Sequence, residues 1–352
     1  MSVSVPGPDS CHDHGVADEL TVVQRYDSLL LDLDGVVYVG QHAVPRAAET
    51  VADAAADGRS IRYVTNNASR TPQQVADHLS DLGLPATAAQ VITSAQAGAR
   101  LAAEQVPAGS SVLAVGGPGV VAALSEVGLQ PVAASNDDPG SERIEVAAVV
   151  QGFGRQVGWG ALARASFAVA SGVPWIATNI DRTIPIEGGI APGNGMLVAA
   201  VAEASGRSPQ VAGKPYPAIL QLAAQQAGGA TPLVVGDRLD TDIQGAVAAD
   251  LPVAMVLTGV SGALDLWRAP VEQRPTYLMA DLAGLNQPPL VVEQDRDGYT
   301  CGDASARLVG EQLQVAGERV AAIWAAAQLL WDRGPDREPP NLAAVAQTLA
   351  DR

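Results

Sequence analysis

The sequence predicts an α/β protein with a Rossmann-like parallel sheet at its core. Short segments that are apolar along almost their whole length alternate with Ala-rich, helix-like segments through most of the 352 residues. Strands of this kind are typical of a parallel sheet that helices cover on both faces. Hydrophobic residues make up 47% of the chain and charged residues 17%, so packed cores rather than a disordered chain are expected.

Two stretches of the chain share this alternating pattern. In the first, an Ala-rich helix is expected over residues 44–56. Thr71 followed by Pro72 predicts the start of another helix, because Thr is a favourable N-cap and Pro fits the first helical turn. The pattern returns at Lys214. The strands expected in these two stretches cover residues 29–31, 60–64, 233–235 and 252–257.

An inserted α/β unit is expected between the two stretches, because a second alternating block runs from Ser111 to about Ser205. Residues 131–141 are rich in Asn, Asp, Pro and Gly, which indicates a loop. The glycines of residues 115–119 lack the G-x-G-x-x-G spacing of a dinucleotide site, so a turn is the better interpretation than a dehydrogenase fold. The strands of this block are expected over residues 112–115, 144–150 and 175–178.

A third unit follows the Gln-Pro-Pro segment at residues 287–289, which marks a boundary. It has strand signals of its own and a helix from about Glu318 to Trp331. That helix carries an apolar stripe wider than an exposed helix should show, so it is expected to pack inside the protein or to support self-association into a homo-oligomer. The stripe consists of Val320, Ile323, Trp324, Ala327, Leu330 and Trp331.

These patterns divide the chain into four parts. The alternating pattern of the core is interrupted by that of the inserted unit, and the C-terminal unit follows it. We expect a flexible arm over residues 1–24, a discontinuous core over residues 25–95 and 206–287, an inserted cap over residues 96–205, and a small α/β appendage over residues 290–352.

The charge balance restricts the partners of the protein. It has 38 acidic and 21 basic residues, for a net charge of −17. Nucleic acids are bound mainly through Lys and Arg, so no nucleic acid is expected as a partner, whereas a small anion needs only one local positive site. The longest apolar run near a helix, residues 320–327, is too short for membrane insertion. Two cysteines without CxxC spacing, and the acidic residues within residues 1–20, indicate a cytoplasmic protein.

A pair of carboxylates follows the first expected strand. Asp32 and Asp34 stand where that strand ends, which is where open α/β sheets keep their sites. Side chains two apart on a strand share a face, so both acids can reach one crevice. Gly35 permits a sharp turn and offers a bare N–H to a phosphate oxygen.

A second acidic cluster repeats this design after residues 233–235. Asp237 stands at the tip of the strand, and Asp240 and Asp242 follow it. Carboxylates around a small open site suit Mg²⁺, which takes only one or two of them and keeps several waters. Asp240 is better explained as a residue favoured by the N-terminal end of a helix, whereas Asp237 is a candidate metal ligand.

Hydrogen-bond donors and a cation complete the set. Thr65 and Asn66 follow the strand over residues 60–64 and offer the hydroxyl and N–H groups that a phosphoryl group needs. Lys214 could neutralise charge on the phosphoryl group. Each of these features is weak alone, but the four segments in this order form a complete phosphoryl-transfer site. The sequence therefore predicts a Mg²⁺-dependent phosphatase that acts on a small phosphate monoester.

These segments resemble the four motifs of the haloacid dehalogenase (HAD) superfamily. The resemblance covers roughly residues 26–287 and implies a Rossmann-like core with a C2-type cap inserted between the second and third motifs. Residues 177–181 and 192–195 are similar to the branch that contains phosphoglycolate, glycerol 3-phosphate and pyridoxal phosphatases. The long appendage is similar to that of actinobacterial glycerol 3-phosphate phosphatases. The matching motifs are residues 32–35, 65–67, 213–215 and 236–242.

The resemblance implies a role for each motif residue. It makes Asp32 the nucleophile, which forms an aspartyl-phosphate, and Asp34 the group that protonates the leaving alcohol and then activates water. It implies that Asp242 supports the site from behind the metal ligands. The expected set is therefore Asp32 and Asp34 for catalysis, Gly35, Thr65, Asn66 and Lys214 for phosphate binding, and Asp32, Asp34 and Asp237 for the metal.

The substrate and one non-enzymatic alternative stay open at this point. Arg182, Thr183 and Ile184 in the cap are expected to select the substrate, because the core presents only the phosphate site. Glycerol 3-phosphate is favoured by the resemblance, with phosphoglycolate and pyridoxal phosphate as alternatives. A phospho-accepting receiver protein is the alternative from another class, although receivers lack an inserted cap and have no need of an acid such as Asp34.

Overall fold

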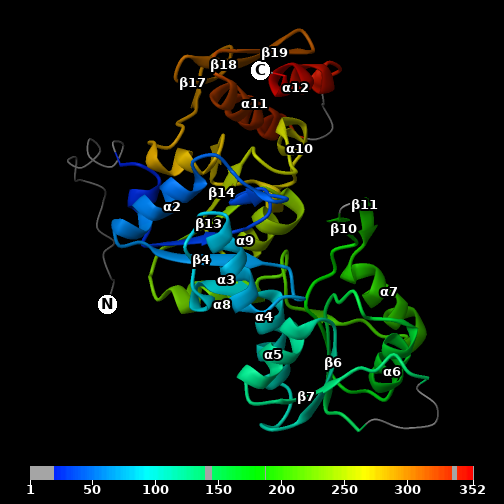
Figure 1. The fold of residues 1–352 in the computed structure, drawn as a ribbon. Helices are drawn as coiled ribbons and strands as arrows, with labels where there is room; N and C mark the ends of the chain where they lie inside the picture. Colours follow the sequence, from blue (N-terminus) through cyan, green and yellow to red (C-terminus); the bar gives the residue numbers. More distant parts are fainter. Residues whose placement is uncertain (1–19, 139–144, 187, 335–338, 352) are drawn as a thin grey trace, which may run out of the picture.

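The computed structural model describes residues 20–138, 145–186, 188–334 and 339–351 of the chain (Figure 1). It is an α/β protein with three separate sheets of more than two strands, and the predicted fold class is confirmed. Most of the arm expected over residues 1–24 lies outside the described residues, as does Cys11. Among the described residues, no helix combines the length and the apolarity that crossing a bilayer requires.

The core is a six-stranded, fully parallel sheet with the strand order β15-β14-β13-β1-β4-β5. Strand β1 lies between β13 and β4, so the two stretches of chain that flank the insertion pair directly with each other. This pairing brings the first and the last acidic motif to neighbouring strand ends. The strands are β1 (Ser28–Leu31), β4 (Ser60–Thr65), β5 (Val91–Thr93), β13 (Pro232–Gly236), β14 (Val253–Val256) and β15 (Tyr277–Met279).

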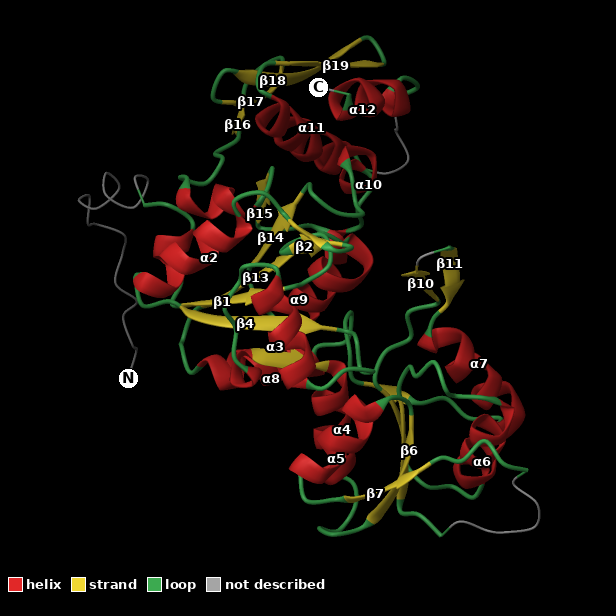
Figure 2. Ribbon diagram, viewed as in Figure 1, coloured by secondary structure: helices red, strands yellow, loops and turns green. Residues whose placement is uncertain are grey.

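Helices cover both faces of the core sheet (Figure 2). Leu29 and Leu31 of β1 join one apolar cluster, while Leu30 joins the other, as expected for a strand buried on both sides. Thr71 caps α3 through a capping box with Gln74, which confirms the predicted start. The helices around this sheet are α2 (Ala47–Ala56), α3 (Pro72–Asp81), α8 (Ala218–Ala227), α9 (Gln244–Ala248) and α10 (Ala263–Trp267), and a small hairpin joins β2 (Tyr38–Val39) to β3 (His42–Ala43).

The inserted unit is built on a five-stranded parallel sheet with the order β12-β9-β8-β6-β7. Its strands are β6 (Ser111–Val115), β7 (Gln130–Ala133), β8 (Ala148–Gln151), β9 (Trp175–Ala177) and β12 (Gln210–Val211). Its helices are α4 (Ser94–Ala103), α5 (Pro118–Glu126), α6 (Trp159–Ala170) and α7 (Asn194–Ser205), and a hairpin of β10 (Thr183–Ile186) and β11 (Gly189–Pro192) extends from it.

Two predictions for this unit were wrong in detail. Strand β7 extends to Ala133, into the segment expected to be a loop, because Pro131 is tolerated where β7 forms an edge of the sheet. Strand β12 pairs with β9, so the second sheet extends past the boundary expected at residue 205. Both strands are short, and neither carries the long apolar run by which the other strands were recognised.

The glycine-rich segment after β6 is a turn against the core, as the sequence indicated. It leads into α5. A Cβ at Gly117 would lie 2.6 Å from the backbone oxygen of Ser69, and a Cβ at Gly119 would lie 2.4 Å from that of Arg70. Glycines are therefore required here because the cap and the core approach each other backbone to backbone.

The C-terminal unit is a four-stranded antiparallel sheet packed on α11 (Arg319–Arg333). The apolar stripe of α11 is buried within the protein except for Trp331, which is half-buried. Trp267 of α10 donates a hydrogen bond from Nε1 to the Ile323 oxygen at 3.0 Å. Internal packing of this stripe is thus confirmed, whereas self-association stays a prediction. The strands are β16 (Glu293–Gln294), β17 (Gly298–Cys301), β18 (Ala304–Val309) and β19 (Gln312–Ala316), and α12 (Leu342–Ala350) follows α11.

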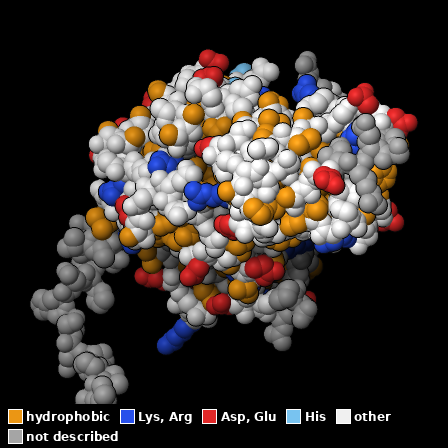
Figure 3. Space-filling view, turned by 90° about the horizontal axis from the view of Figure 1, so that it is seen from below, with side chains coloured by type: hydrophobic (Ala, Val, Ile, Leu, Met, Phe, Trp, Pro, Cys, Tyr) orange, Lys and Arg blue, Asp and Glu red, His pale blue; other side chains and the backbone are white. Residues whose placement is uncertain are grey.

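One face of the protein shows how its charges are distributed, and the expected absence of a nucleic-acid partner stays a prediction. On the face shown in Figure 3, Lys and Arg side chains are scattered among acidic ones and do not gather into one patch.

The junction between the core and the C-terminal unit can be tested at Trp267, which is 4% exposed. Trp267→Ala should lower the free energy of unfolding by about 3 to 5 kcal/mol, because it removes a large buried side chain and leaves a cavity. Val271→Ala nearby is the control: this side chain is 71% exposed and should change stability by no more than about 0.5 kcal/mol. Urea denaturation checks both, and equal midpoints for the two variants would contradict the described packing.

Candidate active site

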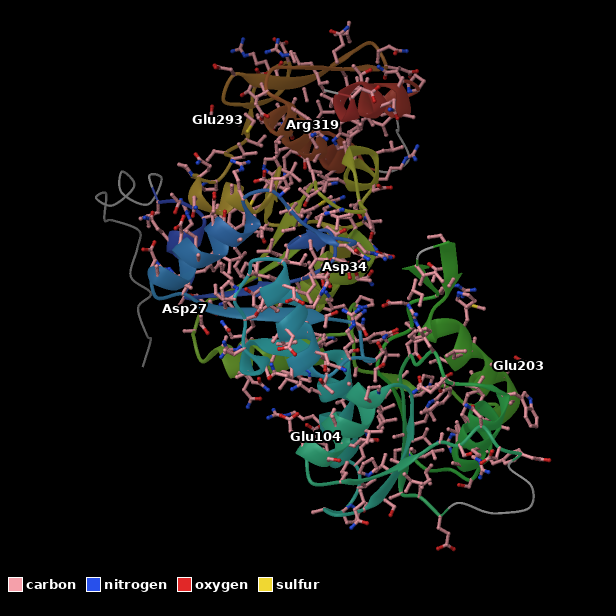
Figure 4. The ribbon with its side chains drawn as sticks, viewed as in Figure 1. Asp27, Asp34, Glu104, Glu203, Glu293 and Arg319 are labelled. Atoms are coloured by element: carbon pink, nitrogen blue, oxygen red, sulfur yellow. The ribbon has the colours of Figure 1, made fainter. Side chains whose placement is uncertain are left out.

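The acidic and polar motif residues meet at one edge of the core sheet. Asp32 follows β1, Thr65 ends β4, and Asp237 follows β13. The strands are parallel and adjacent, so their carboxyl ends lie side by side. Figure 4 shows Asp34 on the side of the core that faces the cap hairpin. The site therefore lies where the core faces the inserted unit.

Lys214 joins the two acidic motifs. Its side chain is buried, and Nζ forms ion pairs with Asp32 and, at 2.6 Å, with Oδ1 of Asp242. Burial alone would lower the pKa of Lys214, but the charges of Asp242 and Asp32 outweigh it and raise the pKa above the usual value. The ammonium therefore stays charged and holds both carboxylates in place.

Three carboxylates form a cluster that can hold a cation. One oxygen each of Asp32, Asp237 and Asp242 lies within 4.8 Å of the others. Burial, and then the charge of Asp242, raise the pKa of Asp32 and also that of Asp237, the latter to about 6. Oδ1 of Asp237 is buried and has no hydrogen-bond partner among the described residues, although Oδ2 accepts from the Val260 N–H at 2.7 Å. A buried carboxylate oxygen without a hydrogen-bond partner costs free energy unless a cation binds it. The site therefore fits a hard metal ion.

Asp242 is held too firmly to be a free ligand. Besides its ion pair with Lys214, it accepts at Oδ2 from the N–H groups of Asp237 at 3.3 Å and Arg238 at 3.1 Å. This arrangement suits a residue that orients its neighbours, and the supporting role that the resemblance implies for Asp242 stays a prediction. Asp240 instead forms two hydrogen bonds with the exposed Arg238 side chain, at 3.0 and 3.1 Å, and takes no part in the cluster.

Gly35 serves the site differently from the sequence prediction. Its N–H already donates to the Tyr38 oxygen at 2.7 Å, so it does not offer the bare N–H that we expected for phosphate. Its φ of +89° favours glycine, and a Cβ would lie 2.5 Å from the Asp237 carboxylate. At Gly259 a Cβ would lie 2.0 Å from the same carboxylate. The absence of a side chain at both positions leaves room for Asp237.

Thr65 and Asn66 lie beside Lys214 at the end of β4. Thr65 is buried, and its Oγ1 accepts from the Asn67 N–H at 3.1 Å, which leaves the hydroxyl hydrogen to donate to a phosphoryl oxygen. The Asn66 side chain instead contacts the backbone of Lys214 and the cap residue Asp181. Phosphate binding by Asn66 stays a prediction for its backbone N–H alone.

Asp34 lies outside the carboxylate cluster, exposed at the mouth of the site. The surrounding protein partly desolvates its carboxyl group and raises the pKa of Asp34. A raised pKa favours the protonated form of this carboxyl group, which is the form that a general acid requires. The location and the environment of Asp34 thus differ from those of Asp32, as two distinct catalytic roles would require.

Known proteins resemble this chain in both sequence and fold. A family model described as haloacid dehalogenase-like hydrolase matches residues 29–130, and a second, described as HAD-hydrolase-like, matches residues 211–285. The chain is 45% identical over 268 residues to a D-glycerol 3-phosphate phosphatase of Mycobacterium tuberculosis, covering 76% of this chain and 73% of that one. The chain belongs to the haloacid dehalogenase superfamily.

Two further relatives extend this comparison. An acid sugar phosphatase of Staphylococcus aureus is 37% identical over 262 residues, covering 74% of this chain and 96% of that one. The crystal structure of a glycerol phosphate phosphatase from Mycobacterium tuberculosis with magnesium matches with a TM-score of 0.79 and 38% identity, over 89% of this chain and 93% of that one. The larger structural coverage shows that the similarity to this HAD protein extends into the C-terminal unit.

The cap residues predicted to select the substrate are not the ones that contact the core site. Arg182 and Thr183 are exposed at the base of the hairpin and Ile184 is half-buried, so their role stays a prediction. Two other cap residues bond to the core motifs: Asp181, whose carboxylate accepts from Asn66, and Asn179, whose Nδ2 donates to the Asn66 oxygen. No sequence pattern indicated these contacts, because only the fold brings the residues together.

The roles of Asp32 and Asp34 can be separated with substrates that differ in their leaving groups. Asp32→Asn should lower turnover by roughly 10⁴-fold or more with every phosphomonoester, because the nucleophilic charge is lost while the volume is kept. Asp34→Asn should cost about 10²- to 10⁴-fold with an alkyl phosphate but much less with 4-nitrophenyl phosphate, whose leaving group needs little protonation. Steady-state kinetics on the two substrates checks this. An equal loss on both in Asp34→Asn would show that Asp34 is not the acid.

The metal ligand can be identified by comparing two aspartates of one motif. Asp237→Ala should raise the Mg²⁺ concentration for half-maximal activity at least about tenfold. Even the loss of a residue that only holds a metal ligand in place can lower metal affinity by this much. Asp240→Ala is the matched control and should change it little, because this side chain bonds only to Arg238. Titration of the chelator-treated protein with Mg²⁺ measures both values. Similar shifts in the two variants would remove Asp237 as the ligand.

Proposed function

We propose that this protein is a Mg²⁺-dependent phosphatase that hydrolyses glycerol 3-phosphate through an aspartyl-phosphate on Asp32. The observation that carries this proposal is the buried Lys214, which pairs with the candidate nucleophile and with Asp242 of the acidic motif at once. A nucleophilic carboxylate, a fixed cation and an acidic ligand with one unpartnered oxygen, at adjoining strand ends, are the parts that phosphoryl transfer needs. A receiver protein would have no use for the inserted cap.

In the first step, an oxygen of Asp32 attacks phosphorus and the bond to the glycerol oxygen breaks. Asp34 gives its proton to that oxygen, so that glycerol leaves as a neutral alcohol. Lys214 and Thr65 hold the phosphoryl oxygens during the transfer. When bound at Asp32, Asp237 and the backbone oxygen of Asp34, Mg²⁺ would neutralise the charge that the phosphoryl group carries.

In the second step, Asp34 accepts a proton from water as the water oxygen attacks phosphorus. The bond between phosphorus and Asp32 breaks, inorganic phosphate leaves, and both aspartates return to their initial states. Two steps replace one difficult displacement by water, which is the advantage of a covalent intermediate.

Glycerol 3-phosphate is proposed as the substrate because the relative with 45% identity carries that activity in its name. Phosphoglycolate and pyridoxal phosphate are the alternatives. We also propose a cytoplasmic location and a small-molecule partner only, from the acidic charge balance and the cysteine pattern of the sequence.

The substrate assignment predicts a preference that kinetics can measure. The kcat/KM for glycerol 3-phosphate should exceed those for phosphoglycolate and pyridoxal phosphate by roughly tenfold or more, a difference of about 1.4 kcal/mol. Asp32→Asn, purified in the same way, controls for contaminating phosphatases. A higher kcat/KM for either alternative would replace glycerol 3-phosphate, while a lack of turnover on all three would contradict a phosphatase of this substrate class.

A further inference from the structure

The Asn66 side chain is bonded to the backbone of Lys214 on both sides. Its Oδ1 accepts from the Lys214 N–H at 2.8 Å, and its Nδ2 donates to the Lys214 oxygen at 3.0 Å. These partners fix the orientation of the amide. In the opposite orientation, Nδ2 would face the Lys214 N–H and Oδ1 would face the Lys214 oxygen, so donor would meet donor and acceptor would meet acceptor. A side chain at the end of β4 thus determines where the backbone of Lys214 lies.

The same amide also reaches the cap. Nδ2 lies 3.3 Å from each carboxylate oxygen of Asp181. The backbone of Asp181 is itself fixed, because its N–H donates to Oδ1 of Asn179 at 3.2 Å and its oxygen accepts from the Gly195 N–H at 2.9 Å. One side chain therefore connects the core, the lysine segment and the segment before the cap hairpin.

The backbone oxygen of Asn66 adds two bonds to this connection. It accepts from Nδ2 of the buried cap residue Asn179 at 2.7 Å and from Oγ of Ser94, at the start of α4, at 2.6 Å. Asn179 belongs to the cap, and Ser94 is the first residue of α4, directly after the core strand β5. Asn66 is therefore hydrogen-bonded both to the cap and to the segment by which the chain leaves the core, so the position of one can affect the other.

Gly213 shows how closely these segments approach. A Cβ at this position would lie 2.5 Å from Oδ1 of Asn66 and 2.5 Å from the backbone oxygen of Thr178. Glycine at position 213 lets the chain that carries Lys214 pass between Asn66 and the end of the cap sheet. The glycine before the lysine thus has a structural cause in the contact that Asn66 makes.

We propose that Asn66 is a positioning residue, which sets the Lys214 ammonium against Asp32 and couples that placement to the cap through Asp181. The proposal rests on the proposed function for the identity of the nucleophile. Its physical basis is that the Lys214 ammonium must reach Asp32 and Asp242 together. A displacement of about 1 Å at a catalytic group can cost on the order of 100-fold in rate.

A double-mutant cycle between Asn66 and Lys214 tests the first half of this proposal. In the otherwise native chain, Asn66→Ala should lower kcat about 10- to 100-fold, with a smaller change in KM. In the Lys214→Ala background, Asn66→Ala should lower kcat by less than about threefold, because the ammonium that Asn66 positions is absent. Lys214→Met, which keeps the stem, replaces Lys214→Ala if that variant does not fold.

The same cycle is measured by binding, so that it does not depend on turnover. Calorimetry gives the Kd for inorganic phosphate of the Mg²⁺-loaded variants, and the coupling should again appear. Equal losses from Asn66→Ala with and without Lys214 would overturn the proposal, as would native kcat in Asn66→Ala. Absence of hydrolysis in the native protein, with coupling still seen in phosphate binding, would contradict the proposed function but not the role of Asn66.

A matched control separates positioning from a general loss of stability. Asn136 in the cap also makes two hydrogen bonds to backbone groups: its Nδ2 donates to the Gln156 oxygen, and its Oδ1 accepts from the Gly158 N–H. Asn136→Ala should therefore lower the thermal midpoint to a similar extent but leave kcat and the phosphate Kd unchanged. If it reduced kcat as much as Asn66→Ala does, the effect would be unspecific and the proposal would fail.

Variants of Asp181 test the coupling to the cap. Asp181→Ala removes the acceptor and should lower kcat by about three- to tenfold, whereas Asp181→Asn keeps an acceptor oxygen and should restore most of that loss. The double variant Asp181→Ala/Asn66→Ala should have a kcat no lower than that of Asn66→Ala alone. Native kcat in Asp181→Ala, or additive losses in the double variant, would overturn the coupling to the cap.

Discussion

The buried ammonium of Lys214 is the interaction on which the site depends. It lies at 3% exposure between Asp32, which follows β1, and Asp242, which belongs to the motif after β13. Burial, and then the repulsion between carboxylates this close together, raise the pKa values of Asp32 and Asp237. The charge of Lys214 opposes this rise in both pKa values and so offsets part of the repulsion. Removing it would leave buried carboxylates unpaired.

The order of the sheet explains why this cluster can form from such distant parts of the chain. Strand β1 pairs with β13 across an insertion that contains a second sheet, and the acidic motifs become neighbours only when that pairing is made. The lysine segment then returns from the cap sheet, directly after β12, to the core. Lys214 therefore lies at the point where the chain leaves the cap and re-enters the core. The position of the cap can influence catalysis through this connection.

The sequence predicts the parts of this arrangement that depend on local patterns. Apolar strands that end in Asp32 and Asp237, the Thr71 cap and the buried stripe of α11 all follow from composition and spacing, and the structure contains each of them. The short strands β7 and β12 lack such a pattern. The role of Gly35 was predicted wrongly, since the close approach of Asp237 depends on contacts between strands. The same reason explains why the contact between Asn66 and Asp181 could not be foreseen.

The central claim is that Asp32 becomes phosphorylated during turnover, and trapping the phosphoenzyme tests it most directly. The Asp34→Asn variant, loaded with Mg²⁺ and mixed with 4-nitrophenyl phosphate, should accumulate the intermediate because the base that activates water is missing. Acid quenching followed by peptide mass spectrometry would locate the phosphoryl group. The account predicts one phosphoryl group on the peptide that contains Asp32, and none when Asp32 is also replaced by Asn. A phosphoryl group on another residue, or turnover with no covalent intermediate, would contradict it.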